Sequence, residues 1–371
     1  MSAISRTVYA SAGIAAAAAV AMSAGASGAS AAPNWSTVSS ASAGGGMAAL
    51  VKAAQAEGTL NVIALPNDWA NYGAELKTFT KKYGIKINDE APDDSSAQEI
   101  QAIKQGRGRS SAPDVVDVGE SFTIDAPLFA SYKVSSWSAI PAAAKDPKGR
   151  WFNDYGGYIS FGCDMSIVKA CPSTWSQLLS PQYKGDVALN GAIGQAAAAT
   201  DAVYAAGLNN GGSVTNTQPG IAFFNKLKSV GNFNSDDCNA ASVIEAGQCP
   251  ILINWDYLNS AKAYGLPATL KWKVNDPAGK VFAGYYVQAI NKNAPHPAAA
   301  RLWEEFLYST QGQNLWLKGG ARPIELQSMA KLHTEDQAAY KALPKVKGTP
   351  VLPTVAQSAA ALQAISAAFP S

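Results

Sequence analysis

The chain has 371 residues, with 47% hydrophobic and 15% charged side chains. This balance is typical of a soluble globular protein of one or two domains, and it excludes a largely disordered chain. The formal net charge is +2. So weak a charge gives no electrostatic reason to expect nucleic acid or an anionic membrane surface as a partner.

The N-terminal residues 1–32 have the layout of a secretory signal peptide. Arg6 gives a weakly positive start, an Ala-rich apolar run covers 14–22, and Ala29-Ser30-Ala31 offers the small residues of a cleavage site. A low-complexity tail and a short membrane helix are the alternatives, but the run is too short for a stable span. No cysteine lies near the cleavage site, so we expect an exported, periplasmic protein without a lipid anchor.

Four cysteines form two local pairs, Cys163 with Cys171 and Cys238 with Cys249. In an oxidising compartment an even number of cysteines at short spacings predicts two disulfides. Zinc is the alternative, but neither pair has the spacing of a zinc site, and the chain has only two histidines. We therefore expect no bound metal and no cofactor.

Strand and helix patterns alternate after a linker and short helix at 33–58. A nearly unbroken apolar run predicts a strand buried on both faces, and apolar residues three and four apart predict helices. Ser96 and Glu99 have the spacing of a capping box for a helix that ends at Gly106. The expected elements are strands at 59–65, 85–88 and 114–118 and helices at 72–83 and 96–106. This βαβαβ order indicates an open parallel sheet.

A second region of the same kind begins near Tyr158. Its expected elements are strands at 186–189 and 251–254, helices at 195–206 and 219–231, a returning strand at 281–290, and a helix with Pro297 in its first turn. No internal repeat of 20–50 residues is visible, which argues against a solenoid or a propeller.

Three stretches resemble family 1 extracellular solute-binding proteins of ABC importers. They are PSTWSQLLSPQYKG at 172–185, NAPHPAAARLWEEFLYSTQGQ at 293–313 and GGARP at 319–323. The resemblance covers about 60–323 and is nearest to spermidine/putrescine-type receptors, with ferric-iron and phosphonate receptors as close cousins. These motifs belong to the scaffold, so they are specific for the family and poor indicators of the ligand.

The resemblance implies an α/β, two-lobed type II periplasmic binding fold, with a mixed, mostly parallel sheet flanked by helices in each lobe. It places lobe 1 at 59–157 and 284–322, lobe 2 with C-terminal helices at 158–283 and 323–371, and the crossings between lobes near 155–159 and 283–286. It also implies a monomer that closes on a small solute and delivers it to an ABC permease in the inner membrane.

Ligands of open α/β sheets bind beyond the carboxyl ends of the strands. The loops at those ends and the returning strand carry three carboxylates and several aromatic rings, without Lys or Arg. Aromatic faces and carboxylates both attract ammonium groups, so the ligand we expect is a small cation of the polyamine type. The candidate ligand-binding residues are Asp68, Trp69, Tyr72, Glu120, Ser121, Asn190, Trp255, Asp256, Tyr257, Tyr285 and Tyr286.

Each candidate has a structural alternative. Asp68 suits a helix cap, and Trp69 and Trp255 suit core packing. Trp255-Asp256 matches the aromatic and acidic residues in the later cleft loops of polyamine receptors. The hinge-strand Trp and Asp of those receptors are replaced here around Gly284 and Tyr286, which departs from the polyamine pattern.

Three other functions compete with a cation receptor. A ferric or small-anion receptor has the same fold, but neighbouring Tyr285 and Tyr286 on a regular strand point to opposite faces, so both could ligate one iron ion only if the strand were irregular there. A secreted carbohydrate-active enzyme would use two of the three carboxylates. Because neither histidine is placed for a nucleophile site and no phosphate-loop or His-Glu-x-x-His motif occurs, we expect no catalysis.

Overall fold

The computed structural model describes Met1 and residues 32–238, 240–260 and 265–370. It divides into two compact units, Met1–Ala32 and Pro33–Ser371, and the second unit contains every element named below. The expected signal peptide 1–32 falls on residues that, apart from its two ends, lie outside this description. In the described part of the chain, no helix is long and apolar enough to cross a membrane.

The first lobe is built as the alternating pattern predicts. Its elements are α1 Met47–Glu57, β1 Thr59–Ile63, α2 Tyr72–Tyr83, β2 Lys86–Glu90, α3 Ser96–Gly106 and β3 Val115–Gly119, followed by the 3-10 helix η2 Glu120–Leu128. β1 and β2 pair in parallel. The first-lobe helices and strands predicted from the sequence are confirmed, with strand ends that differ by one or two residues.

The predicted capping box of α3 is wrong by one residue. Ser95 is the N-cap and Gln98 closes the box with it. Ser96 and Glu99, the pair expected from the sequence, bind the backbone of β3 instead. Ser96 Oγ accepts the Gly119 N–H at 3.1 Å, and Glu99 Oε2 accepts the Asp117 N–H at 2.8 Å. A local sequence pattern does not distinguish a cap from a contact with the next strand.

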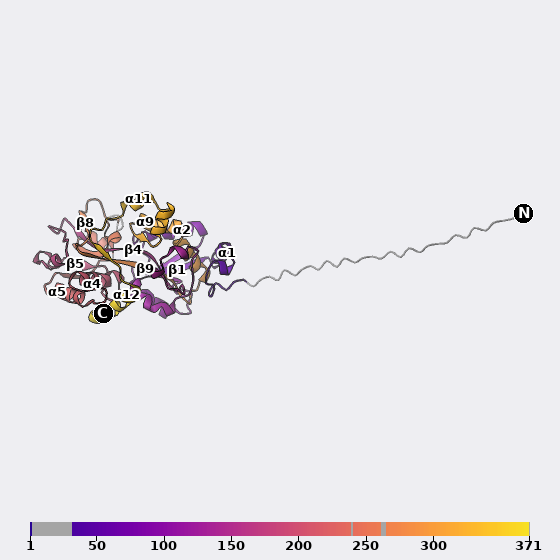
Figure 1. Cartoon of the computed structure of the whole chain (residues 1–371), viewed down its shortest axis with the longest axis horizontal. Helices are drawn as coiled ribbons and strands as arrows, with labels where there is room; N and C mark the ends of the chain where they lie inside the picture. Colours follow the sequence, from indigo (N-terminus) through magenta and orange to yellow (C-terminus); the bar gives the residue numbers. More distant parts are fainter. Residues whose placement is uncertain (2–31, 239, 261–264, 371) are drawn as a thin grey trace. The chain divides into compact units, whose positions relative to one another are not determined.

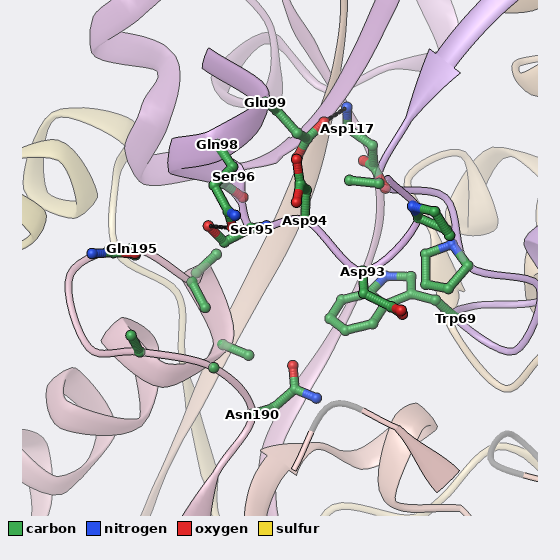
Figure 2. Close-up of a pocket in the computed structure, with 18 of the residues that line it drawn as sticks. Trp69, Asp93, Asp94, Ser95, Ser96, Gln98, Glu99, Asp117, Asn190 and Gln195 are labelled. Atoms are coloured by element: carbon green, nitrogen blue, oxygen red, sulfur yellow. Dashed lines mark hydrogen bonds between the residues drawn. The ribbon is translucent and has the colours of Figure 1, made fainter. Parts of the chain in front are cut away.

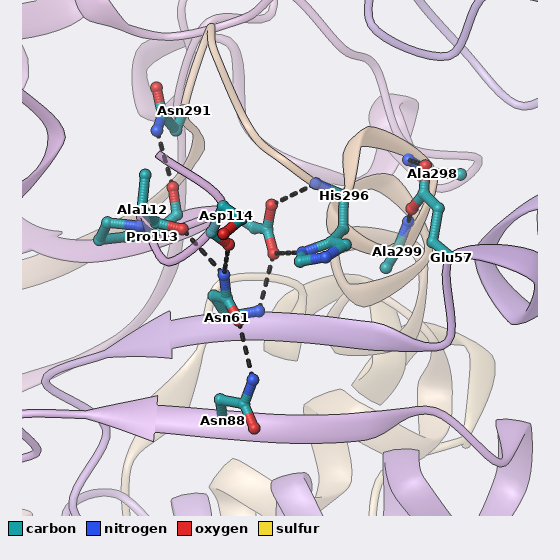
Figure 3. A network of polar contacts seen from close by, with 11 residues as sticks. Glu57, Asn61, Asn88, Ala112, Pro113, Asp114, Asn291, His296, Ala298 and Ala299 are labelled. Carbon is teal, nitrogen blue, oxygen red and sulfur yellow. Dashed lines mark hydrogen bonds and ion pairs between the residues drawn. The ribbon is translucent and has the colours of Figure 1, made fainter. Parts of the chain in front are cut away.

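Asp114 joins β1, β3 and a later helix, α8 Pro297–Leu307 (Figure 3). Its carboxylate accepts the backbone N–H groups of Asn61 and His296, each at 2.7 Å, and lies 2.8 Å from His296 Nδ1. Hydrogen bonding to Asp114 raises the pKa of His296. Glu57 accepts the N–H groups of Ala298 and Ala299, so a side chain of α1 satisfies the amides that begin α8.

Two long antiparallel strands continue from the first lobe into the second (Figure 1). β4 Phe152–Asp164 and β9 Lys280–Ile290 pair with each other between Phe152 and Tyr158, and β9 also pairs with β3. Beyond that point β4 pairs with β7 Ile251–Trp255 and β8 Trp272–Asn275. Among the described residues, these five strands belong to one nine-stranded mixed sheet.

The second lobe repeats the alternation with parallel pairing of β5 to β6 and β7. Its elements are η5 Trp175–Leu179, η6 Pro181–Tyr183, β5 Val187–Leu189, α4 Ala197–Asn209, α5 Gln218–Ser229, β6 Phe233–Asp237, α6 Ala241–Glu245 and α7 Asp256–Asn259. Both predicted disulfides are present, Cys163–Cys171 and Cys238–Cys249. They close short loops beside β4 and β7, which restricts the unfolded chain in this lobe.

The C-terminal segment returns to both lobes. Its elements are α9 Thr310–Lys318, β10 Arg322–Pro323, α10 Leu326–Leu332, α11 Gln337–Ala342, β11 Thr349–Val351 and α12 Val355–Ala368; short 3-10 helices elsewhere are η1 Ser42–Gly44, η3 Trp137–Ala139 and η4 Ala142–Ala144. α12 packs against η2 and α4 through Ala361, Leu362 and Ile365, which are buried. One helix therefore contacts an element of each lobe.

Candidate functional site

A cavity of about 150 Å³ lies where the loops of the two lobes meet (Figure 2). We call it the interlobe pocket. The first lobe contributes the segment after β1, the loop before α3 and the end of β3; the second lobe contributes the β5–α4 connection, and β9 contributes one tyrosine. The lining residues are Ala64, Pro66, Trp69, Pro92, Asp93, Asp94, Ser95, Ser96, Gln98, Glu99, Asp117, Asn190, Gly191, Ala192, Gln195, Ala196, Ala197, Ala198 and Tyr286.

The lobes touch each other at the edge of this pocket. The N–H of Ala97 in α3 donates to the carbonyl of Gln195 at 3.3 Å. Gly119 at the end of β3 lies so close to α4 that a Cβ atom built there would be 2.2 Å from the Cβ of Ala197. The described conformation is therefore a closed one, with no room for a side chain between β3 and the start of α4.

Backbone strain is concentrated in the two first-lobe loops that flank the pocket. Among the described non-glycine residues, positive φ angles occur at Ala64, Ala70, Asn71 and Ala91, and otherwise only at His333. Left-handed backbone at Ala costs free energy and persists where the surrounding structure imposes it, often at functional sites. Four of these five positions therefore lie in the two first-lobe loops that also contribute residues to the pocket.

Carboxyl groups dominate the polar side of the interlobe pocket. Asp93, Asp94, Glu99 and Asp117 line it, and Figure 2 shows the carboxyl groups of Asp94 and Glu99 close together. Burial raises the pKa of Glu99 well above its usual range, with Asp117 and Asp94 adding to the effect. Among the described residues that line the pocket, none is Lys, Arg or His.

Asp117 is the most tightly held of these acids. Burial raises its pKa to about 7, while hydrogen bonds from the hydroxyls of Tyr155 and Tyr72 act to lower it. Its neighbour Asp154 is also fully buried, and burial together with the proximity of Asp117 raises the pKa of Asp154. A positive charge bound in the pocket would favour the ionised form of these carboxyls.

Aromatic rings form another part of the pocket wall. Trp69 and Tyr286 meet edge to face, with ring centres 5.5 Å apart. Behind them Tyr155 stacks on Tyr286 at 5.6 Å with an interplanar angle of 3°, and Tyr257 lies between Trp69 and Trp255, at 6.4 Å and 6.3 Å. The wall combines ring faces, which attract cations, with a rigid apolar support.

Three of the candidate residues from the sequence, Trp69, Asn190 and Tyr286, line the interlobe pocket. The others surround it at different depths. Asp68 is exposed, and Tyr72 is buried behind the pocket, where its hydroxyl donates to Asp117 at 2.9 Å. Glu120 and Ser121 are buried in η2.

The remaining candidates lie around the strands that connect the lobes. Asp256 is buried and forms an ion pair with Arg322, its Oδ2 lying 2.7 Å from Nη1. It also accepts the N–H groups of Tyr158 and Tyr257. The buried charge of Asp256 therefore has its partners within the protein. Asp256 and Tyr257 border a separate cavity of about 410 Å³ beside α9 and α11.

Tyr285 and Tyr286 have different surroundings, as their positions on a regular strand predict. Tyr286 is part of the aromatic wall, whereas Tyr285 covers Gly156, where an added Cβ would lie 2.7 Å from the Tyr285 ring. Across the described residues there is no group of three or more His, Cys, Asp or Glu placed to hold a metal ion.

Sequence reasoning missed the four carboxyls of the interlobe pocket. Asp93 and Asp94 lie in the loop between β2 and α3, a strand end from which no candidate was taken, and Glu99 has the spacing of a cap. Asp117 carried a usable signal, because an acid inside the apolar run Val115–Gly119 is expensive to bury without a role. Asp117 was not among the candidates because it lies within β3, and the rule selects residues that follow a strand.

A family model described as "Bacterial extracellular solute-binding protein" matches residues 118–345, more than half of the chain. The chain belongs to this family. The predicted resemblance to extracellular solute-binding proteins is thereby confirmed, and the chain is a solute-binding protein rather than an enzyme. A search of curated proteins found no match to the chain.

Solved structures with this fold include several periplasmic receptors. AgtB from A. tumefaciens R10 with agropinic acid has a TM-score of 0.62 at 15% identity, covering 83% of this chain and 96% of that one. Iron-bound HitA from Pseudomonas aeruginosa has 0.60 at 20% identity, covering 84% and 98%. AfuA from Actinobacillus pleuropneumoniae with fructose-6-phosphate has 0.59 at 18% identity, covering 72% and 85%. The predicted two-lobed periplasmic binding fold is confirmed.

Proposed function

We propose that this solute-binding protein is the periplasmic receptor of an ABC importer and that its ligand is a small organic cation. It is exported by the signal peptide at 1–32, acts as a monomer, and delivers the ligand to a permease in the inner membrane. The family, the closed two-lobed fold and the pocket between the lobes support this function.

The chemistry of the interlobe pocket carries the choice of ligand. Four carboxyls line the pocket together with the ring of Tyr286 and the indole of Trp69, without a basic side chain among the lining residues. A carboxylate bonded to an ammonium group contributes about 1.5–3 kcal/mol, and a ring face contributes about 0.5–2 kcal/mol. An anionic ligand would meet four acids and no counter-charge.

The size of the pocket limits the ligand. A volume of about 150 Å³ is below the ~300–1,000 Å³ that is common for drug-sized ligands. Within the polyamine class, the closed pocket therefore suits a diamine of the size of putrescine better than a longer polyamine. Receptors of the same fold with agropinic acid, iron and fructose-6-phosphate show that the scaffold leaves this choice to the pocket.

A small anion, such as a phosphonate, is the second candidate. Helix α4 begins at the pocket, Ala196 provides no side-chain cap, and Ala197 and Ala198 line the cavity. Free N–H groups at a helix start attract anions. This single feature is outweighed by Asp93, Asp94, Glu99 and Asp117 on the facing wall.

Thermal unfolding with a ligand panel tests the proposal. An amine such as putrescine at 100 times its Kd stabilises the protein by about 2.7 kcal/mol, which raises Tm by roughly 2–4 °C or less for a chain of this length. A shift produced by phosphonates or ferric citrate, and by none of the amines, would reject a cationic ligand.

Glu99→Gln separates the acidic pocket from general charge effects. The amide side chain keeps an oxygen for the Asp117 N–H but cannot ionise when an ammonium group binds, so amine affinity is expected to fall by about 2 kcal/mol, roughly thirty-fold in Kd. Glu90→Gln is the matched control, because Glu90 is exposed and lies outside the pocket lining. Equal Kd values for the two variants, measured by calorimetry, would remove Glu99 from the site.

A further inference from the structure

One buried hydroxyl joins two residues of the interlobe pocket. The indole Nε1–H of Trp69 donates to Tyr155 Oη at 2.7 Å, and that hydroxyl donates to Asp117 Oδ2, also at 2.7 Å. Tyr155 itself is fully buried and does not line the pocket. Its position fixes an aromatic residue of the loop after β1 relative to an acid of β3.

The same carboxylate oxygen is held from a second side. Tyr72 donates to Asp117 Oδ2 at 2.9 Å, and Gln288 Nε2 donates to Tyr72 Oη at 2.8 Å. Tyr155 lies on β4 and Gln288 on β9, the two strands that connect the lobes. The geometry of Asp117 therefore depends on both connecting strands.

We propose that Tyr155 is a positioning residue for ligand binding. Its hydroxyl accepts from Trp69 and donates to the Asp117 carboxylate, so it fixes both side chains and couples strand β4 to the pocket. The proposal rests on the proposed function, because it takes the bound group to be an ammonium ion. Tyr155 acts through Trp69 and Asp117 and does not touch the ligand.

Loss of the hydroxyl has a defined electrostatic consequence. Burial raises the pKa of Asp117 to about 7, and the Tyr155 hydroxyl opposes that rise. Without it the carboxyl ionises at a higher pH, and each unit of additional pKa makes pairing with a cation about tenfold weaker below that pKa. Trp69 Nε1 would also lose its hydrogen-bond partner.

The groups around Asp117 are themselves buried and hard to ionise. The carboxyls of Glu99 on α3, Asp154 on β4 and Glu304 on α8 all have pKa values raised by burial, with Asp117 contributing. Asp117 adds to the raised pKa values of Tyr72, Tyr155, Tyr257, Tyr286 and Tyr308, but of these five only Tyr72 and Tyr155 donate a hydrogen bond to its carboxylate. Arg322 pairs with Asp256 instead.

Tyr155→Phe removes the hydroxyl and keeps the ring that stacks on Tyr286. Tyr308→Phe is the matched control, since Tyr308 is buried in the same lobe and its hydroxyl donates to the carbonyls of Phe152 and Asn153, away from the pocket. We expect Tyr155→Phe to weaken putrescine binding at pH 7 about tenfold or more, whereas Tyr308→Phe leaves Kd within about twofold.

A ligand-free measurement keeps this test separate from the proposed function. In carboxyl ¹³C NMR titrations of the apo protein, Tyr155→Phe is expected to move the midpoint of Asp117 to higher pH, with no movement in Tyr308→Phe. An unchanged midpoint, or equal changes in both variants, overturns the positioning role. If the midpoint shifts in Tyr155→Phe but the wild-type protein binds no amine, the proposed ligand is rejected and the positioning of Asp117 by Tyr155 stands.

Discussion

Gly119→Ala is expected to prevent the lobes from closing while leaving each lobe folded. Gly119 has a φ of −58° and a ψ of 148°, which alanine adopts without strain. Its new Cβ would lie 2.2 Å from the Cβ of Ala197, well inside the ~3.5–4.0 Å separation of carbon atoms in contact. The lobes would have to separate by more than about 1 Å, and putrescine binding should weaken at least tenfold.

Small-angle scattering measures this effect directly. The wild-type radius of gyration should decrease when ligand is added, and that of Gly119→Ala should not. Ala197→Gly in the same chain removes the opposing Cβ and should restore both closure and affinity, at a cost of about 0.5–1 kcal/mol in α4. Wild-type affinity in Gly119→Ala alone would show that the ligand does not require this closed contact.

The free energy of unfolding is expected to fall as the pH rises above 4.5, the ordinary pKa of a glutamate, and Glu75 is a main cause. Glu75 on α2 is fully buried and neither carboxyl oxygen has a hydrogen-bond partner. Burial raises its pKa well above 4.5. The folded protein thus holds a proton that the unfolded chain releases above pH 4.5, and the stability is lost as pH rises toward the folded-state pKa.

Glu75→Gln should remove this part of the pH dependence. At pH 5 the variant and the wild type should have similar free energies of unfolding. At higher pH the variant should be the more stable, by about 1.4 kcal/mol for each pH unit over which the buried proton is retained. Denaturant unfolding at pH 5 and 8 measures the difference. Parallel pH profiles for wild type and variant would show that Glu75 is ionised in the native protein.

Much of the fold could be predicted because local patterns and tertiary structure agree. The helix at 72–83 and the helix that begins at Pro297 have apolar residues at helical spacing and observed starts that match. β4 was recognised only as a crossing point, because its Gly156-Gly157 pair and polar residues do not form an apolar run. Its 13-residue strand exists because β9, β7 and β8 supply partners along its length.

The site was harder to predict than the fold. The rule for strand ends found Trp69, Asn190 and Tyr286, which line the interlobe pocket. It also selected Asp256, whose partner Arg322 is distant in sequence, so no local pattern could reveal the ion pair. Asp94 and Glu99 enter the pocket because α3 packs on β3, and this is a tertiary contact that spacing does not encode.

Native mass spectrometry of the receptor, purified from bacteria without unfolding, tests the central claim most directly. A chain that closes on a small cation should carry a bound organic molecule, and solvent extraction should release a compound that reacts with an amine-specific reagent. Recovery of iron, or of an anionic molecule without an amine, as the bound species would contradict a cation receptor.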